Sequence, residues 1–159
     1  MRKPGIKTAL LLVTILAACS AMDREPLSVP VGTLVLETIP NPLIAKSLGA
    51  GEFEIAFLLT MREEGGVDTR IESFTVEAVT IGGLVVRSET HGPGFITARG
   101  FPADVGAGQL LQFEFVKRWK LPSDLLMKGA GVRVTARTVD ANGRRNSASY
   151  RGDVRVLPQ

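Results

Sequence analysis

The chain has 159 residues, a length typical of one domain, and its 45% hydrophobic and 22% charged residues are ordinary for a soluble globular protein. Its net charge of +3 comes from the first residues: three of the 19 Lys and Arg precede Cys19 and none of the 16 Asp and Glu do, which leaves 16 of each. A neutral domain gives no electrostatic basis for nucleic-acid binding or for a polybasic membrane patch.

Residues 1–18 have the composition of an export signal. A basic stretch with Arg2, Lys3 and Lys7 leads into an apolar run of 11 residues at 8–18. That run is too short to span a bilayer core of ~30 Å, which takes about 20 helical residues. The basic flank, the short apolar run and the small residues together predict a cleaved signal peptide rather than a buried helix.

The run ends in Leu16-Ala17-Ala18-Cys19. This motif resembles the lipobox of bacterial lipoproteins. The resemblance implies that a diacylglycerol is joined to the Cys19 thiol, that cleavage occurs between Ala18 and Cys19, and that Cys19 becomes the first residue of the mature chain. Because two or more acyl chains anchor stably, we expect the protein to be held on a membrane without spanning it.

Ser20 follows the lipidated cysteine, and lipoprotein sorting rules imply the outer membrane if the host has two membranes. Residues 19–29 are predicted to be a short polar tether. Cys19 is the only cysteine of the chain, so no intramolecular disulfide can form, and residues 30–159 must be held together by their own apolar core.

Residues 30–159 are predicted to form strands, because apolar and polar side chains alternate in short runs that Gly, Pro and Asn separate. The first strand is expected near residues 31–36, and Pro40 and Pro42 then interrupt it, as suits an edge strand that changes partners. The clearest alternation, at 52–62, predicts one inward face made of Phe53, Ile55, Phe57, Leu59 and Met61.

Three further features predict how the later strands are arranged. Ile71 is out of phase with the residues that follow it, which predicts a bulge near Ser73. Residues 109–121 alternate again and place Trp119 inward. The pair Asn142-Gly143 predicts a hairpin turn into the last strand, because both residues accept positive φ.

About seven strands with polar outer faces predict an all-β fold, a single antiparallel β-sandwich. The strand order resembles immunoglobulin-like and fibronectin type III-like domains of secreted bacterial proteins. Residues 60–67 resemble their B–C turn, and residues 134–143 resemble the hairpin of their last two strands. The chain has neither the cysteine pair nor the central-strand Trp of antibody domains, so the resemblance implies the sandwich and no binding site.

No catalytic constellation is evident in the sequence. His91, the only histidine, is expected to be a solvent-exposed loop residue, with a lone base or metal ligand as the alternative. Glu63 and Glu64 are expected to be solvated in a turn. Asp140 and Asn142 could offer oxygens to Ca²⁺, yet a hairpin turn uses the same residues. We therefore expect no enzyme activity, no cofactor and no metal site.

Residues 117–120, Lys-Arg-Trp-Lys, are the one candidate ligand site. Arg118, Trp119 and Lys120 could hold an anionic glycan or lipid head group through charge and cation–π contact. The alternation instead favours a core Trp119 with the two cations on a solvated strand face, where they would discourage sheet-to-sheet aggregation.

The sequence thus predicts a lipid-anchored, non-enzymatic protein of the cell envelope whose sandwich presents loops or a sheet edge to another envelope protein or glycan. Two alternatives remain. The domain could bind a carbohydrate or another surface ligand, or it could be an enzyme or an enzyme inhibitor. An enzyme would need a cleft that joins His91 to a carboxylate within hydrogen-bond reach, and an inhibitor would need a protruding loop at residues 91–95.

Overall fold

The computed structural model describes residues 28–122, 125–126 and 129–157. The predicted signal peptide (1–18), Cys19, Ser20 and most of the tether lie outside the described residues. Leu125 and Leu126 are helical. The other described elements are nine strands and one short helix. In chain order these are β1 (Leu34–Ile39), β2 (Leu43–Gly49), β3 (Glu52–Glu63), β4 (Thr69–Val79), β5 (Val85–His91), α1 (Pro93–Thr97), β6 (Asp104–Val105), β7 (Leu110–Lys120), β8 (Gly131–Asp140) and β9 (Arg145–Leu157).

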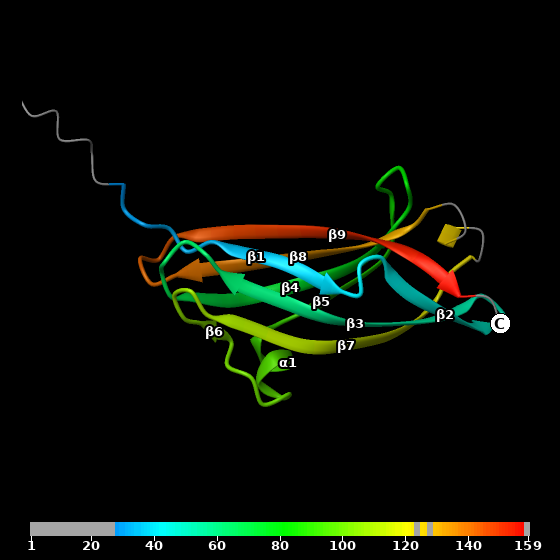
Figure 1. The fold of residues 1–159 in the computed structure, drawn as a ribbon, viewed down its shortest axis with the longest axis horizontal. Helices are drawn as coiled ribbons and strands as arrows, with labels where there is room; N and C mark the ends of the chain where they lie inside the picture. The colour runs from blue at the N-terminus through cyan, green and yellow to red at the C-terminus, as the bar shows by residue number, and fades with distance from the viewer. Residues whose placement is uncertain (1–27, 123–124, 127–128, 158–159) are drawn as a thin grey trace, which may run out of the picture.

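The long strands follow the long axis of the molecule (Figure 1) and form two layers, sheet A and sheet B, which β9 joins because it pairs with β8 and, at its end, with β2. In sheet A, β3 has β7 on one side and β1 followed by β2 on the other. In sheet B the order is β5, β4, β8, β9. The predicted all-β, immunoglobulin-like sandwich is confirmed.

The side chains between the two sheets form one apolar core. The inward face predicted for β3 is confirmed, since all five of its apolar residues are buried. Trp119 of β7 is 5% exposed, as its predicted inward place requires. Phe74 of β4 is fully buried, and its ring centre lies 5.8 Å from that of Phe113 and 6.4 Å from that of Phe115. Rings from both sheets therefore meet in the core.

The strand count and pairing differ from the predicted seven antiparallel strands. Pro40 and Pro42 lie between β1 and β2, which pair with the same edge of β3, and β6 adds a two-residue strand beside β4. The predicted change of partner at the prolines is therefore only partly correct, because β2 keeps β3 as a partner and in addition pairs in parallel with the end of β9. The sheet is therefore mixed, and β9 links the two layers.

The first strand begins at Leu34 rather than near Val31. Residues 29–33 form what we call the N-terminal strap, which is bonded to the end of the sandwich. Asn142 Nδ2 donates to the Pro30 carbonyl at 3.2 Å, and Asn146 Nδ2 donates to the Gly32 carbonyl at 2.8 Å. These donors are more than 100 residues away in the chain, so the alternation at 31–36 could not predict that the N-terminal strap is bonded in this way.

Two predicted irregularities are confirmed. The pairing of β4 with β8 shifts register between Ile71 and Ser73, which is the expected bulge. The chain reverses between β8 and β9 around Asn142-Gly143, and Gly143 has a φ of 76°, a conformation that glycine adopts without strain.

The two ends of the sandwich carry different turns (Figure 1). The N-terminal strap and the turns at 64–68, 106–109 and 141–144 lie at one end, which we call the N-terminal end. The turns at 49–51 and 80–84 and the last residues of β9 lie at the opposite end, which we call the far end.

Candidate functional site

The side chains of sheet A that point away from the core form a surface that we call the outer face. Alternate residues of a strand point to opposite sides, so these side chains lie between the residues of the core, and all are at least partly exposed except Thr60, which is 4% exposed. The register aligns them in rows across the sheet, from the N-terminal end to the far end. The rows are Glu37–Thr60–Gln112, Ile39–Leu58–Glu114, Ile44–Ala56–Val116, Lys46–Glu54–Arg118 and Glu52–Lys120.

Apolar side chains gather in the middle of the outer face. We call this group the apolar patch, and its members are Ile39, Ile44, Ala56, Leu58 and Val116. Ile39 is 53% exposed, Leu58 38% and Val116 49%. Ile39 pairs with Leu58, and Ala56 pairs with Val116. The pairing of β2 with β3 begins at Ala45, and extending its register by one residue places Ile44 beside Ala56, with the exposed Arg155 of β9 on the other side of Ile44. A contiguous exposed apolar patch marks an interaction surface more often than a lone exposed residue does.

Charged side chains border the apolar patch at both ends. Towards the N-terminal end, an Arg62 guanidinium nitrogen lies 3.9 Å from Glu37 Oε2. Towards the far end, Arg118 Nε lies 2.7 Å from Glu54 Oε2, and the exposed Lys46 pairs with Glu54 in the strand register. Exposed ion pairs of this kind contribute little to stability, so the polar border is compatible with a partner binding there.

The three candidate ligand residues do not share one surface. Trp119 is buried in the core, and its indole N–H donates to Glu89 Oε1 at 3.2 Å. Arg118 and Lys120 point to the outer face instead. Cation–π contact and ring stacking need an accessible ring face. A ligand held by Arg118 or Lys120 would therefore not have the ring of Trp119 available.

A polar cluster that the sequence did not predict lies between β5 and β7. Glu89 of β5 accepts from Trp119, and its Oε2 lies 2.6 Å from Lys117 Nζ. His91 Nε2 lies 3.9 Å from the same oxygen. Lys117 interrupts the predicted alternation of β7 because it occupies an inward position, in phase with Phe115 and Trp119. An inward-pointing charge on an edge strand discourages pairing with a foreign strand.

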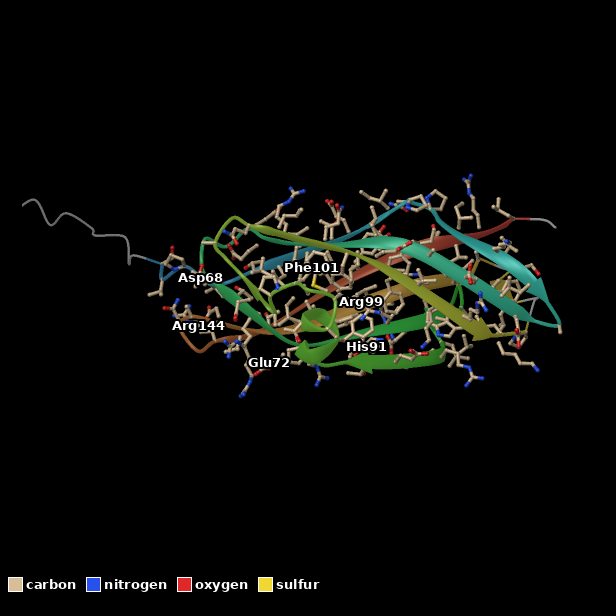
Figure 2. The ribbon with its side chains drawn as sticks, turned by 90° about the horizontal axis from the view of Figure 1, so that it is seen from below. Asp68, Glu72, His91, Arg99, Phe101 and Arg144 are labelled. Atoms are coloured by element: carbon tan, nitrogen blue, oxygen red, sulfur yellow. The ribbon has the colours of Figure 1, made fainter. Side chains whose placement is uncertain are left out.

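His91 is not the solvent-exposed loop residue that was predicted. It ends β5, and its side chain is 16% exposed. Its ring centre lies 4.1 Å from that of Phe95 in α1 and 5.0 Å from that of Phe74, and Figure 2 shows it beside α1. Burial lowers the pKa of His91, and the nearby Glu89 only partly opposes that effect. A neutral imidazole packed among aromatic rings explains the position without a catalytic role.

Glu63 is not a solvated turn residue either. It is 1% exposed. Its carboxylate accepts four backbone N–H groups at 2.8 to 3.1 Å, from Thr33, Gly65, Gly66 and Gly108. Burial alone would raise the pKa of Glu63, but these four bonds outweigh it and leave the pKa lowered. Glu63 thus joins the N-terminal strap to two turns of the N-terminal end.

Asp140 has the matching role in the β8–β9 hairpin. Its carboxylate accepts the N–H of Gly32 at 3.1 Å, of Asn142 at 2.9 Å and of Arg144 at 2.8 Å. The bond from Arg144 contributes most to lowering the pKa of Asp140. The Asp140 oxygens considered for Ca²⁺ are thus engaged by N–H donors. Within the described ranges, no group of three or more His, Cys, Asp and Glu side chains is placed to hold a metal ion.

A groove of about 580 Å³ lies at the N-terminal end, between the turn that precedes β4 and the turn that follows β8. Asp68, Arg70, Asp104 and Ala141 are among its lining residues. Arg70 Nε lies 2.7 Å from Asp104 Oδ1, which neutralises that pair and leaves the carboxylates of Asp68 and Asp140 in the lining. Figure 2 shows Asp68 at this end of the molecule.

Comparison with known proteins supports the fold and does not supply a family. No protein-family model and no curated protein sequence matches the chain. A Northeast Structural Genomics Consortium target is 12% identical, with 80% of this chain and 87% of that chain covered and a TM-score of 0.52. A Bordetella pertussis protein given the name ApaA is also 12% identical, with 80% and 96% covered and a TM-score of 0.52.

A looser likeness, at a TM-score of 0.37 and 16% identity, is to the CARDB domain of a Pyrococcus furiosus protein crystallised with di-metal ions. It covers 82% of this chain and 99% of that domain. The two neighbours with a TM-score of 0.52 share the fold of this chain, and at 12% identity the likeness extends to the fold alone.

Proposed function

We propose that this chain is a lipid-anchored, non-enzymatic protein of the cell envelope whose sandwich binds another protein through the apolar patch. The observation that carries the proposal is the apolar patch itself. Along a strand of an antiparallel sheet, the residues that face solvent are ordinarily polar, and they alternate with the apolar residues that face the core. Here Ile39, Leu58 and Val116 are between 38% and 53% exposed and adjoin one another.

The organisation of the outer face supports protein binding over ligand binding. A specific protein interface commonly has an apolar centre that loses water and a polar rim that stays hydrated. The apolar patch supplies the centre, and the Glu37–Arg62 and Glu54–Arg118 pairs supply the rim. The surface follows three neighbouring strands, which suits a flat partner rather than a small molecule.

The titratable groups support a non-enzymatic role. Glu63 and Asp140 hold backbone N–H groups, and Glu89 holds Lys117 and Trp119. A perturbed pKa in a cleft often marks a catalytic group, but structural bonding perturbs pKa values as well. Each of these three carboxylates has such a structural task.

The lipid anchor is supported by the sequence motif at Cys19 and is compatible with the fold. In the described part of the chain, no helix has the length and apolar character needed to cross a bilayer. The N-terminal strap starts at residue 29, and about ten residues separate it from Cys19, which reach at most ~35 Å when fully extended. If the host has two membranes, Ser20 assigns the anchor to the outer one.

Photo-cross-linking in growing cells tests the apolar patch in the full chain. A photoreactive amino acid replaces Leu58, and in a matched control it replaces Ser147, which is exposed on sheet B. We expect one discrete adduct from position 58 and none from position 147. Val116→Glu should remove the adduct, because binding would then bury an unpaired carboxylate. Equal adducts from both positions, or an adduct that survives Val116→Glu, would contradict the proposal.

Mass spectrometry and cell fractionation test the anchor. The processed chain should begin at Cys19 and carry the mass of at least two acyl chains. Cys19→Ser should leave the precursor uncleaved and unlipidated, whereas Ser20→Asp should keep the lipid and, in a two-membrane host, move the protein to the inner membrane. A bare Cys19 thiol in the native protein would rule out the anchor.

A further inference from the structure

We propose that the partner of the apolar patch is a second copy of this chain, packed face to face with its strands antiparallel to those of the first. This inference rests on the proposed function, because it uses the same surface. It follows from the order of apolar and charged rows along the outer face. Two copies of this face are complementary when their strands run antiparallel and not when their strands run parallel.

The two central rows of the outer face match each other. One row contains Ile39, Leu58 and Glu114, and the next contains Ile44, Ala56 and Val116. A two-fold axis that runs across the strands between these rows places each row on the other. Ile39 then faces Ile44 of the second copy and Leu58 faces Ala56, so apolar side chains cover one another on β1, β2 and β3, while on β7 Glu114 faces Val116 at the edge of the sheet.

The rows on either side of the centre carry opposite charges. The same axis brings the row of Glu37 onto the row of Lys46 and the row of Arg62 onto the row of Glu52. All four side chains are exposed. Two copies would thus form Glu37–Lys46 and Arg62–Glu52 contacts, each twice, because a two-fold interface repeats every contact.

The parallel arrangement is disfavoured by charge. With the two-fold axis along β3, Glu54 would face Glu54 of the second copy and Arg62 would face Arg62. Lys46 would face Arg118, since β2 and β7 flank β3 on opposite sides. Like charges set against each other across an interface oppose association. The antiparallel orientation removes all three conflicts.

The size of the surface predicts a weak dimer. Three strands about 4.8 Å apart, with about eleven residues at ~3.4 Å each, present roughly 500 Å² per copy. A total near 1,000 Å² lies at the low end of specific interfaces. Confinement to a membrane raises the effective concentration and favours such a contact.

A shared membrane also fixes how the pair would lie. Two identical copies in one bilayer are related by an axis normal to it, so antiparallel strands must run parallel to the membrane plane. The two N-terminal straps then lie at opposite ends of the dimer. Each tether of about ten residues, with a reach of at most ~35 Å, can still return to the bilayer.

Cross-linking between cysteine variants tests the orientation in membranes that contain the full chain. Stacked sheets lie ~10 Å apart, so a short bismaleimide reagent is the probe rather than a direct disulfide. We expect Glu37→Cys chains mixed with Lys46→Cys chains to give a cross-linked dimer, and either variant alone to give none. The parent chain reports any background from Cys19. Products from either variant alone would overturn the antiparallel arrangement.

Charge reversal tests the pairing independently. The measured quantity is the yield of homodimer that is cross-linked by the photoreactive residue at position 58. Glu37→Lys and Lys46→Glu should each lower the yield at least about threefold, because each places like charges together. Both changes in one chain should restore it to within about twofold of the parent, since the pairs are then reversed. Arg87→Glu, on sheet B, should leave the yield unchanged. A double variant no better than the single ones would overturn the proposal.

The adduct from position 58 separates the two proposals. An adduct twice the mass of the chain supports the second copy. An adduct with a different protein, and no homodimer, overturns the second copy while it leaves the proposed interaction surface standing. No adduct at all overturns both.

Discussion

Lys117 Nζ lies 2.6 Å from Glu89 Oε2, and this bond joins the edge strands of two different sheets. The other oxygen of Glu89 accepts the indole N–H of Trp119 at 3.2 Å. Among the described residues, no backbone pairing joins β5 to β7. The Glu89 carboxylate therefore connects these two edge strands on their side of the sandwich.

Glu89→Ala should destabilise the domain by about 1–2 kcal/mol, because a partly buried ammonium and an indole N–H each lose their acceptor. The chain has one Trp, so the emission of Trp119 reports the site directly, and it should shift as the indole loses this bond. Arg87→Ala, an exposed change on the same strand, is the control. An unchanged Trp119 spectrum in Glu89→Ala would show that the bond does not form.

His91 should make the stability fall as the solution becomes mildly acidic. The pKa of His91 is lowered first by burial, with Lys117 and Arg99 adding and Glu89 opposing. The unfolded chain therefore binds the proton at a higher pH than the folded chain. The stabilisation is complete above the unfolded value of about 6.5 and is lost as the pH falls below it towards the folded pKa.

Urea unfolding at pH 7.5 and at pH 5.5 measures this effect. His91→Phe should shrink the difference between the two pH values, because it removes the titrating ring and can still pack against Phe74 and Phe95. The same pH dependence in His91→Phe would assign it to another group.

Glu63→Gln should cost about 2–3 kcal/mol. The amide nitrogen that replaces one carboxylate oxygen is itself a donor, so it would face the N–H groups of Gly66 and Gly108 or of Thr33 and Gly65. The pKa of Glu63 is lowered, so its stabilisation is present above about pH 4.5 and is lost as the pH falls further. Thermal unfolding should therefore show a gap between variant and parent that narrows in acid.

Thr38→Val should raise stability by about 1 kcal/mol. Thr38 is 4% exposed, and its hydroxyl has no hydrogen-bond partner among the described residues. Valine has the same shape without the polar atom. Thr33→Val is the comparison, since the exposed Thr33 hydroxyl donates to the Val31 carbonyl and its loss should not stabilise. Denaturant midpoints decide the matter, and a destabilised Thr38→Val would mean that the hydroxyl is satisfied.

The strands were predictable wherever a residue's environment depends on its immediate neighbours. The alternation in β3 and β7, the bulge at Ile71 and the turn at Asn142-Gly143 all follow from local sequence. Glu63 was not predictable in this way, because its donors at Thr33 and Gly108 lie 30 and 45 residues away.

The candidate site was predictable only in part, for a related reason. Leu58 and Val116 look like isolated exceptions to alternation when each strand is read alone. They become one surface with Ile39 only when the register of three strands is known. His91 was misassigned because the adjacent Gly-Pro-Gly suggested an open loop, whereas these residues lead into α1, which covers the histidine with Phe95.

The N-terminal strap has a mechanical consequence. β1 starts at the strap and runs along β3 towards the far end. Tension applied ahead of residue 29 would therefore act along the strand and load the bonds of its six residues together, in shear, instead of peeling them one after another. Strand bonds loaded in shear resist a larger force than bonds broken one at a time, so this arrangement suits a domain that is pulled at its N-terminus.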